Sequence, residues 1–108
     1  MSTLQPEILV VIVNYRVGAL VVDCLRSLKA EVHAHGARLA DVVVVDNQSG
    51  DDSVVTMRDA IWREGWQDWA RVVESPVNGG FAFGNNLAVR EALARRATYD
   101  YFWLLNPD

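Results

Sequence analysis

Two runs of consecutive aliphatic residues constrain the fold of this chain more than any other feature. Residues 8–13 (ILVVIV) and 42–45 (VVVV) contain only Ile, Leu and Val, with no polar residue inside either run. A strand with one face in water alternates between apolar and polar residues, whereas a strand covered on both faces is apolar throughout. The two runs therefore predict central strands of a sheet that has helices on both faces.

Segments with helical spacing lie between the apolar runs. Residues 17–35 follow the first run, and Ser53–Glu64 follow the second after a polar turn. A weaker strand at residues 71–74, a third helix at 81–97 and a fourth apolar strand at Tyr101–Leu105 complete the pattern. The order βαβαβαβ predicts a single α/β, Rossmann-like domain over the whole chain, with a mostly parallel sheet and right-handed crossovers.

Composition and charge exclude several classes of protein. The 14 acidic and 10 basic residues give a net charge of −4, which argues against a nucleic-acid partner. Cys24 is the single cysteine, so the chain has no internal disulfide, and a cytoplasmic location is the simplest interpretation. The run at residues 8–13 is too short to span a bilayer and has no preceding Lys or Arg, as a signal peptide would. The sequence leaves open whether the protein has a membrane anchor outside these residues.

The residues that follow each strand are the candidates for ligand contact, because parallel α/β sheets bind ligands beyond the carboxyl ends of their strands. These residues are 14–15, 46–47, 76–80 and 106–108, and all four segments are polar or rich in glycine. The first turn contains one glycine, Gly18, whereas a dinucleotide fold needs several. A phosphate-binding P-loop and a Gly-x-Ser-x-Gly nucleophile elbow are also missing from the sequence.

Asp46 and Tyr15 each allow two interpretations. Asp46 ends the valine run, so its carboxylate is placed to accept hydrogen bonds from a base or a ribose, or else to close a local turn. Asp51 and Asp52 already serve to cap the next helix, which favours ligand contact for Asp46. The ring of Tyr15 either contacts a base or sugar or packs beside the first helix, and spacing alone does not separate the two.

The segment 78–86 (NGGFAFGNN) is the most unusual in the chain. Its paired glycines permit close approach of the backbone to a ligand, and a helix N-terminus favours an anionic group. Gly84, Asn85 and Asn86 are poor helix formers within the first turns of a helix, and a frayed start does not explain all three. Asn86 is predicted to lie on the sheet-facing stripe of this helix, with Ala82, Val89 and Leu93.

The last three residues bring oxygen ligands to the end of the fourth strand. Asn106 supplies an amide oxygen and Asp108 a carboxylate, as a hard divalent cation shared with a diphosphate would need. Taken alone, these three residues favour a plain turn over a metal site.

Taken together, four segments resemble the N-terminal half of a family 2 glycosyltransferase with the GT-A fold, especially its rhamnosyltransferase-like branch. The matching segments, in the right order, are VIVNYR (11–16), VVVVDNQSGDDS (42–53), NGGFAFGNN (78–86) and WLLNPD (103–108). The resemblance covers the chain from about Ile8 to its last residue. The combined pattern is specific, although no single segment is.

The resemblance implies a role for each candidate residue. In the family, the ends of the first two strands hold the base and ribose, and the Asn-Gly loop lies along the nucleotide-sugar. The implied nucleotide-binding residues are Tyr15, Asp46, Asn78, Gly79, Gly80 and Asn85. The family's metal motif, usually Asp-x-Asp, binds the diphosphate through Mg²⁺ or Mn²⁺. Asn106 and Asp108 occupy that motif here, with Asn106 in place of the first aspartate.

The implied reaction is the inverting transfer of a sugar from a nucleotide diphosphate sugar to an acceptor hydroxyl. The acceptor is a glycan or a lipid-linked molecule in cell-surface glycan synthesis, and the resemblance alone suggests dTDP-rhamnose as the donor. The family's catalytic base lies downstream of the metal motif. We therefore expect residues 1–108 to be the donor half of a longer protein, inactive by itself, with the full-length protein cytoplasmic or associated with a membrane.

Two alternatives remain at this stage. A sugar-phosphate nucleotidyltransferase has a similar sheet and metal, but its glycine-rich basic loop is missing after the first strand. A non-catalytic α/β interaction module or pseudoenzyme fragment belongs to a different class, and it would cover its exposed sheet edge by forming a homodimer. A receiver-like module is disfavoured because residues 14–16 provide no acid.

Overall fold

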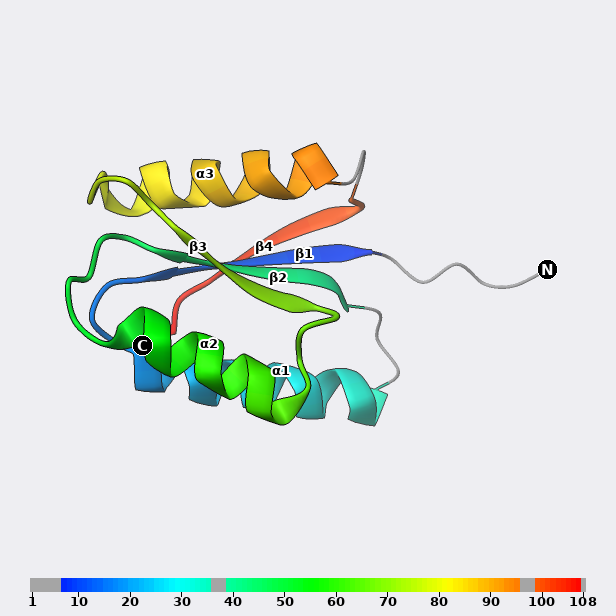
Figure 1. The fold of residues 1–108 in the computed structure, drawn as a ribbon. Helices are drawn as coiled ribbons and strands as arrows, with labels where there is room; N and C mark the ends of the chain where they lie inside the picture. Colours follow the sequence, from blue (N-terminus) through cyan, green and yellow to red (C-terminus); the bar gives the residue numbers. More distant parts are fainter. Residues whose placement is uncertain (1–6, 36–38, 96–98, 108) are drawn as a thin grey trace.

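The computed structural model describes residues 7–35, 39–95 and 99–107, and its elements follow the predicted βαβαβαβ order (Figure 1). The strands are β1 (Ile8–Asn14), β2 (Leu39–Asp46), β3 (Ala70–Glu74) and β4 (Tyr101–Leu105). The helices are α1 (Gly18–His35), α2 (Ser53–Glu64) and α3 (Gly80–Arg95). None of the helices within the described residues is long and apolar enough to cross a membrane.

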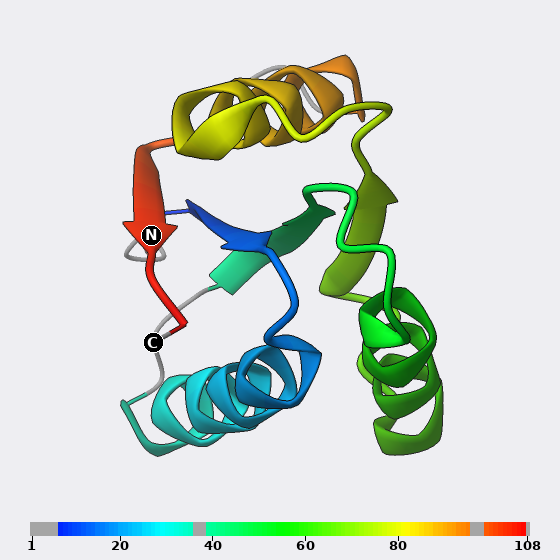
Figure 2. The same cartoon turned by 90° about the vertical axis from the view of Figure 1, so that its left-hand side faces the viewer.

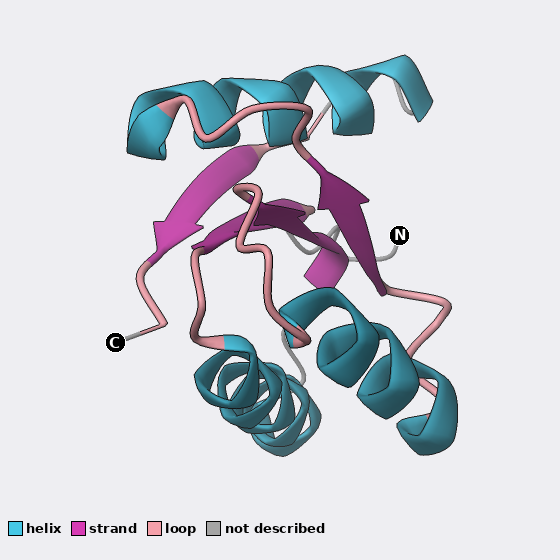
Figure 3. Ribbon diagram, turned by 60° about the vertical axis from the view of Figure 1, so that its left-hand side comes forward, coloured by secondary structure: helices cyan, strands magenta, loops and turns pink. Residues whose placement is uncertain are grey.

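The four strands form one parallel sheet in the order β3-β2-β1-β4. Helices α1 and α2 cover one face and α3 covers the other, as Figures 2 and 3 show. The predicted parallel α/β fold with helices on both faces is confirmed. The two aliphatic runs form the central strands β1 and β2, where valines on both faces are fully buried, and this explains why neither run alternates.

The two faces of the sheet are packed with side chains of different size. On the α1 and α2 side, Val10 and Val44 contact large residues such as Leu25 and Met57. On the α3 side, residues of β1 and β2 pack against two buried alanines of the helix, Ala88 and Ala92. Because alanine is small, α3 lies close to the sheet. A Cβ atom on Gly84 would lie 3.0 Å from a methyl carbon of Val13, so the close approach also requires glycine there.

The prediction of which side of α3 faces the sheet is wrong. The buried residues of α3 are Gly84, Asn85, Ala88 and Ala92, whereas Ala82, Asn86 and Leu93 are exposed and Val89 is half-buried. The larger apolar side chains of this helix suggested the wrong face, because the helix contacts the sheet through its smallest residues.

Strand β4 has the predicted boundaries but is one of the two edge strands of the described sheet. It pairs with β1 on one side. Four of its side chains, which alternate between the two faces, are between 46% and 62% exposed, namely Tyr101, Phe102, Trp103 and Leu104. An apolar run therefore marks a strand correctly here but does not distinguish an edge position from a central one.

Polar contacts add to the attachment of α3. The guanidinium group of Arg71 on β3 donates hydrogen bonds to both carboxylate oxygens of Glu91 on α3, the shortest at 2.6 Å. It also lies 3.5 Å from an oxygen of Asp41, which accepts a hydrogen bond from the hydroxyl of Tyr99. The Arg71, Glu91 and Asp41 side chains are no more than 26% exposed, so solvent weakens these contacts less than it weakens surface ion pairs.

Protonation of Glu91 is expected to weaken this attachment at low pH. Burial alone raises the pKa of Glu91, but the hydrogen bonds and charges of Arg71 and Arg95 outweigh it and lower the pKa below its ordinary value. The carboxylate therefore stabilises the fold above the unfolded-state pKa of about 4.3, and the contribution is lost as the pH falls through the lower folded-state pKa. The destabilisation caused by Glu91→Gln, measured by urea unfolding, should shrink from pH 7 to pH 3.

The exposed acid Asp68 supplies the control for this measurement, because no described contact involves its side chain. Asp68→Asn should leave the free energy of unfolding almost unchanged at both pH values. A Glu91→Gln effect of constant size across the acid range would contradict the role assigned to the ion pair.

Candidate functional site

The carboxyl ends of the parallel strands meet at one rim of the sheet, on the left-hand side of Figure 1, which faces the viewer in Figure 2. A cavity of about 300 Å³ lies at this rim, beside the ends of β1, β2 and β4 and the first turn of α3. Its lining residues are Val13, Tyr15, Val17, Asn47, Phe81, Asn106 and Pro107. Segments far apart in the sequence thus share one concave surface, as the sequence predicted for the strand ends.

A buried hydrogen-bond cluster joins the ends of β1 and β2. Asn14 is fully buried, and its Nδ2 donates to Oδ1 of Asp46 at 2.8 Å and to Oγ of Ser49 at 3.2 Å. The Oδ1 of Asn14 accepts the backbone N–H of Val17 at 3.1 Å. Ser49 donates its hydroxyl to Oδ1 of Asp46 at 2.6 Å and its backbone N–H to Oδ2 at 3.2 Å. The cluster fixes the course of both turns.

The carboxylate of Asp46 therefore makes the local turn contacts that were the alternative to ligand binding. It is 4% exposed and accepts three hydrogen bonds from Asn14 and Ser49. An ionised carboxylate offers about four lone-pair positions, so one acceptor position remains. Direct contact of Asp46 with a ligand stays a prediction.

Asp51 follows the capping interpretation. Its Oδ1 accepts the backbone N–H of Ser53 at 2.9 Å, and hydrogen bonds from Ser53 hold the pKa of Asp51 below its ordinary value. Asp52 occupies the N-cap position of α2 without a side-chain hydrogen bond to the helix. Because Asp51 contacts the start of α2, Asp46 remains the candidate for ligand contact among these three acids.

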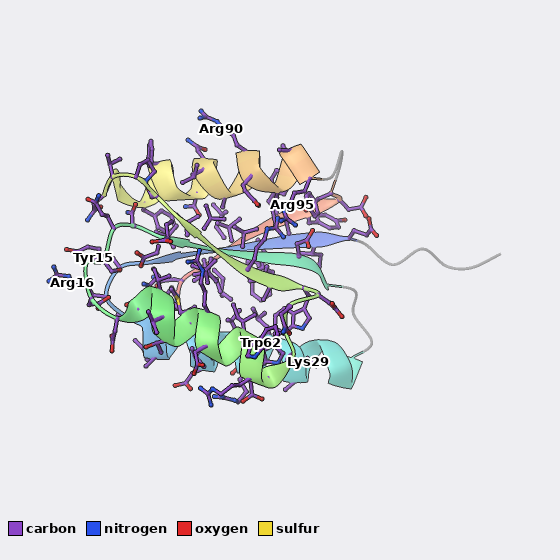
Figure 4. The ribbon with its side chains drawn as sticks, viewed as in Figure 1. Tyr15, Arg16, Lys29, Trp62, Arg90 and Arg95 are labelled. Atoms are coloured by element: carbon purple, nitrogen blue, oxygen red, sulfur yellow. The ribbon has the colours of Figure 1, made fainter. Side chains whose placement is uncertain are left out.

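The ring of Tyr15 is exposed at the rim and is not buried beside the first helix. Its side chain is 45% exposed and lines the cavity, and the guanidinium carbon of Arg16 lies 5.1 Å from the centroid of its ring. Figure 4 shows both side chains on the side of the strand ends. Arg16 has a positive φ of 61° and donates its Nε–H to the backbone oxygen of Ser49 at 2.9 Å. This placement leaves one face of the tyrosine ring available for a ligand.

Asn47, one of the candidate residues that follow β2, connects the rim to the Asn-Gly loop, and no role was predicted for it. Its Nδ2 donates to Oδ1 of Asn78 at 3.1 Å and to the backbone oxygen of Gly80 at 3.2 Å. The residue is only 4% exposed, yet it lines the cavity. Its place next to Asp46 at the strand end was the available signal, but its partners on the loop were not visible in the sequence.

The predicted loop residues lie at the same rim. Gly80 has a φ of 87°, which disfavours any side chain, and it begins α3. Oδ1 of Asn78 accepts the backbone N–H of Gly80 at 3.3 Å, and Gly79 is exposed beside them. Asn85 is 6% exposed on the buried side of α3 and does not line the cavity, so its contact with a nucleotide stays a prediction.

A metal ion at this rim would need ligands from beyond the described side chains. Asn106 lines the cavity at the end of β4, and Asp108 lies outside the described residues. Residues 7–35, 39–95 and 99–107 contain no group of three or more His, Cys, Asp or Glu side chains that could hold an ion. Hard divalent cations take about six oxygen ligands. The described residues could therefore hold such an ion only together with further ligands, such as the oxygens of a bound diphosphate.

Comparison with known proteins gives one informative match. No protein-family model matches the chain, and no curated protein sequence matches it significantly. Among solved structures, the chain is similar to the mannosyltransferase PcManGT from Pyrobaculum calidifontis in complex with GDP-Man and Mn²⁺, with a TM-score of 0.67 and 28% sequence identity. The chain has a glycosyltransferase-like fold. The match covers 82% of this chain and 25% of the mannosyltransferase, so the chain spans about a quarter of that protein.

Proposed function

We propose that the chain is the donor-binding half of the GT-A domain of a glycosyltransferase, which transfers a sugar from a nucleotide diphosphate sugar to an acceptor hydroxyl. The observation that carries this proposal is the cavity at the strand ends of a glycosyltransferase-like fold. Ligands of parallel α/β sheets bind at this edge. The similar mannosyltransferase was solved with GDP-Man and Mn²⁺, which supports a nucleotide-sugar and a divalent metal for this chain as well.

The side chains at the rim suit the parts of such a donor. The exposed ring of Tyr15 packs against the base or a sugar ring. Asp46 holds the turn after β2 and offers its remaining acceptor position to the base or the ribose. The loop of Asn78, Gly79 and Gly80 lies along the donor, and we assign Asn85 to the nucleotide contacts as well.

The metal belongs to the same proposal. Asn106 and Asp108 would hold Mg²⁺ or Mn²⁺ together with the diphosphate. When bound, the ion neutralises negative charge that develops on the leaving nucleotide diphosphate. Asn106 is uncharged, so the affinity of the protein for the ion should be low before the diphosphate binds.

The finer assignments follow the resemblance in the sequence motifs. We propose an inverting, family 2-like enzyme with the GT-A fold, dTDP-rhamnose as its donor, and a glycan or lipid-linked acceptor in cell-surface polysaccharide synthesis. The residues described here serve the donor side of the reaction, and we assign the catalytic base to none of them.

An NMR titration of the chain tests the donor site. GDP-mannose, UDP-glucose and dTDP-rhamnose are added separately, with and without Mg²⁺, and the backbone amides near Asp46, Gly79 and Asp108 are followed. At least one donor should shift the three groups of signals together, and Mg²⁺ should lower the apparent Kd. In a parallel sample, Mn²⁺ should broaden the signals near Asp108 most strongly.

NAD provides the control ligand, because the turn after β1 lacks the glycines of a dinucleotide site. Shifts caused by NAD and not by nucleotide-sugars would reject the proposal. No response to any nucleotide would favour the second candidate, a non-catalytic interaction module. The exposed apolar side chains of β4 favour this candidate, and two copies would then pair through that edge.

A further inference from the structure

Asn47 combines burial with an unsatisfied polar atom at the cavity. Its Oδ1 is buried and accepts no hydrogen bond from the described protein, although the residue lines the cavity. Buried polar groups in native proteins are almost always paired, and each exception calls for an explanation. An acceptor beside a cavity has an obvious partner in the molecule that fills the cavity.

The orientation of the Asn47 amide is determined by its other contacts. Both hydrogen atoms of Nδ2 are used, one by Oδ1 of Asn78 and one by the backbone oxygen of Gly80. Rotating the amide by half a turn would place Oδ1 against these two oxygens, which are both acceptors. The atom of Asn47 left without a partner is therefore the oxygen, and it needs a donor.

The other buried atoms without partners lie elsewhere. Oδ1 of Asn85 and Nε1 of Trp69 also lack partners, but neither residue lines the cavity. Among the described residues, Asn47 alone joins an unsatisfied buried atom to this concave surface. The cavity lining itself carries no charged side chain, since its other members are Val, Tyr, Phe, Asn and Pro.

We infer that Oδ1 of Asn47 accepts a hydrogen bond from a hydroxyl or ring N–H group of the nucleotide-sugar, and that this part of the cavity takes an uncharged ring of the donor. The inference rests on the proposed function. Phosphate oxygens are acceptors with negative charge, so they cannot donate to Oδ1 and would repel it. A volume of about 300 Å³ suits a base or a single sugar ring.

A double-mutant cycle between protein and ligand tests this contact. The tightest-binding donor from the titration is compared with three analogues that each lack one hydrogen-bond donor: a base N-methylated at the ring N–H, a 3′-deoxyribose, and a sugar deoxygenated at one hydroxyl. Kd values are measured by calorimetry for the wild type and for Asn47→Leu. One analogue should bind the wild type about tenfold more weakly than the parent donor, but should bind Asn47→Leu with the same Kd as the parent.

Asn86→Leu is the matched control, because Asn86 is exposed on α3 and does not line the cavity. This variant should discriminate between the ligands as the wild type does. Equal losses for every analogue in the wild type and in Asn47→Leu would overturn the role of Asn47 while leaving the donor site intact. If the wild type binds no nucleotide-sugar at all, the proposed function fails as well.

A measurement on the unmodified protein covers the case in which Asn47→Leu does not fold. The side-chain carbonyl ¹³C signal of Asn47 should move when the parent donor binds and should stay in place with the analogue that lacks the bonded group. An unchanged carbonyl signal at saturation with the parent donor would overturn the inference.

Discussion

Replacing Asp46 with alanine is expected to lower the free energy of unfolding by about 2–4 kcal/mol. The substitution removes an acceptor of three hydrogen bonds in a cluster that is almost closed to water. It leaves one N–H of Asn14 Nδ2 and both the backbone N–H and the hydroxyl of Ser49 without their acceptor, and buried donors without a partner are costly. Urea unfolding followed by circular dichroism gives the value directly.

Asp52→Ala is the control for this experiment. Asp52 is exposed and makes no side-chain capping bond, so its removal should change the free energy of unfolding by less than about 0.5 kcal/mol. Equal stability of the two variants would mean that the hydrogen-bond cluster does not hold the turn after β2.

Gly18→Ala should lower the free energy of unfolding by about 1–3 kcal/mol, the typical cost of overpacking. A Cβ atom at position 18 would lie 2.9 Å from the Cα of Ser53, so the N-termini of α1 and α2 would have to move apart. In an unobstructed helix the same change stabilises by roughly 0.5–1 kcal/mol, because glycine loses more backbone entropy on folding. The expected sign is therefore opposite to the prediction from helix propensity, and thermal unfolding can distinguish the two.

Ser27→Ala on the exposed side of α1 supplies the comparison. It raises helix propensity without a neighbouring backbone to collide with, so it should be neutral or slightly stabilising. If Gly18→Ala behaves in the same way, the two helix N-termini do not pack as closely as described.

The sequence predicted the order of elements and the parallel sheet because these depend on local periodicity and on runs of β-branched residues. The boundaries of α2 and β4 were predicted to the residue. The contact face of α3 was not, because Gly84, Ala88 and Ala92 carry too little hydrophobicity to be recognised as a buried stripe. The exposure of β4 also escaped prediction, because an apolar run does not reveal how many neighbouring strands it has.

The predicted site residues differ in where they lie relative to the cavity. Tyr15 and Asn106 line the cavity, since both directly follow the ends of strands. Asp46 does not line the cavity and is held in a hydrogen-bond cluster, because its turn closes on Ser49. The part played by Asn47 depends on loop residues 31 and 33 positions further along the chain, and no local pattern contains such a contact.

Helix α3 differs from α1 and α2 in how firmly it is held. It rests on the sheet through alanines, whose burial stabilises less than that of the larger side chains beneath the other two helices. Segments with little apolar contact open first in native-state fluctuations. Phe81, in the first turn of α3, also lines the cavity. A molecule bound between Phe81 and the end of β1 would favour the state in which α3 is packed on the sheet. Occupancy of the cavity and amide protection along α3 would then rise together.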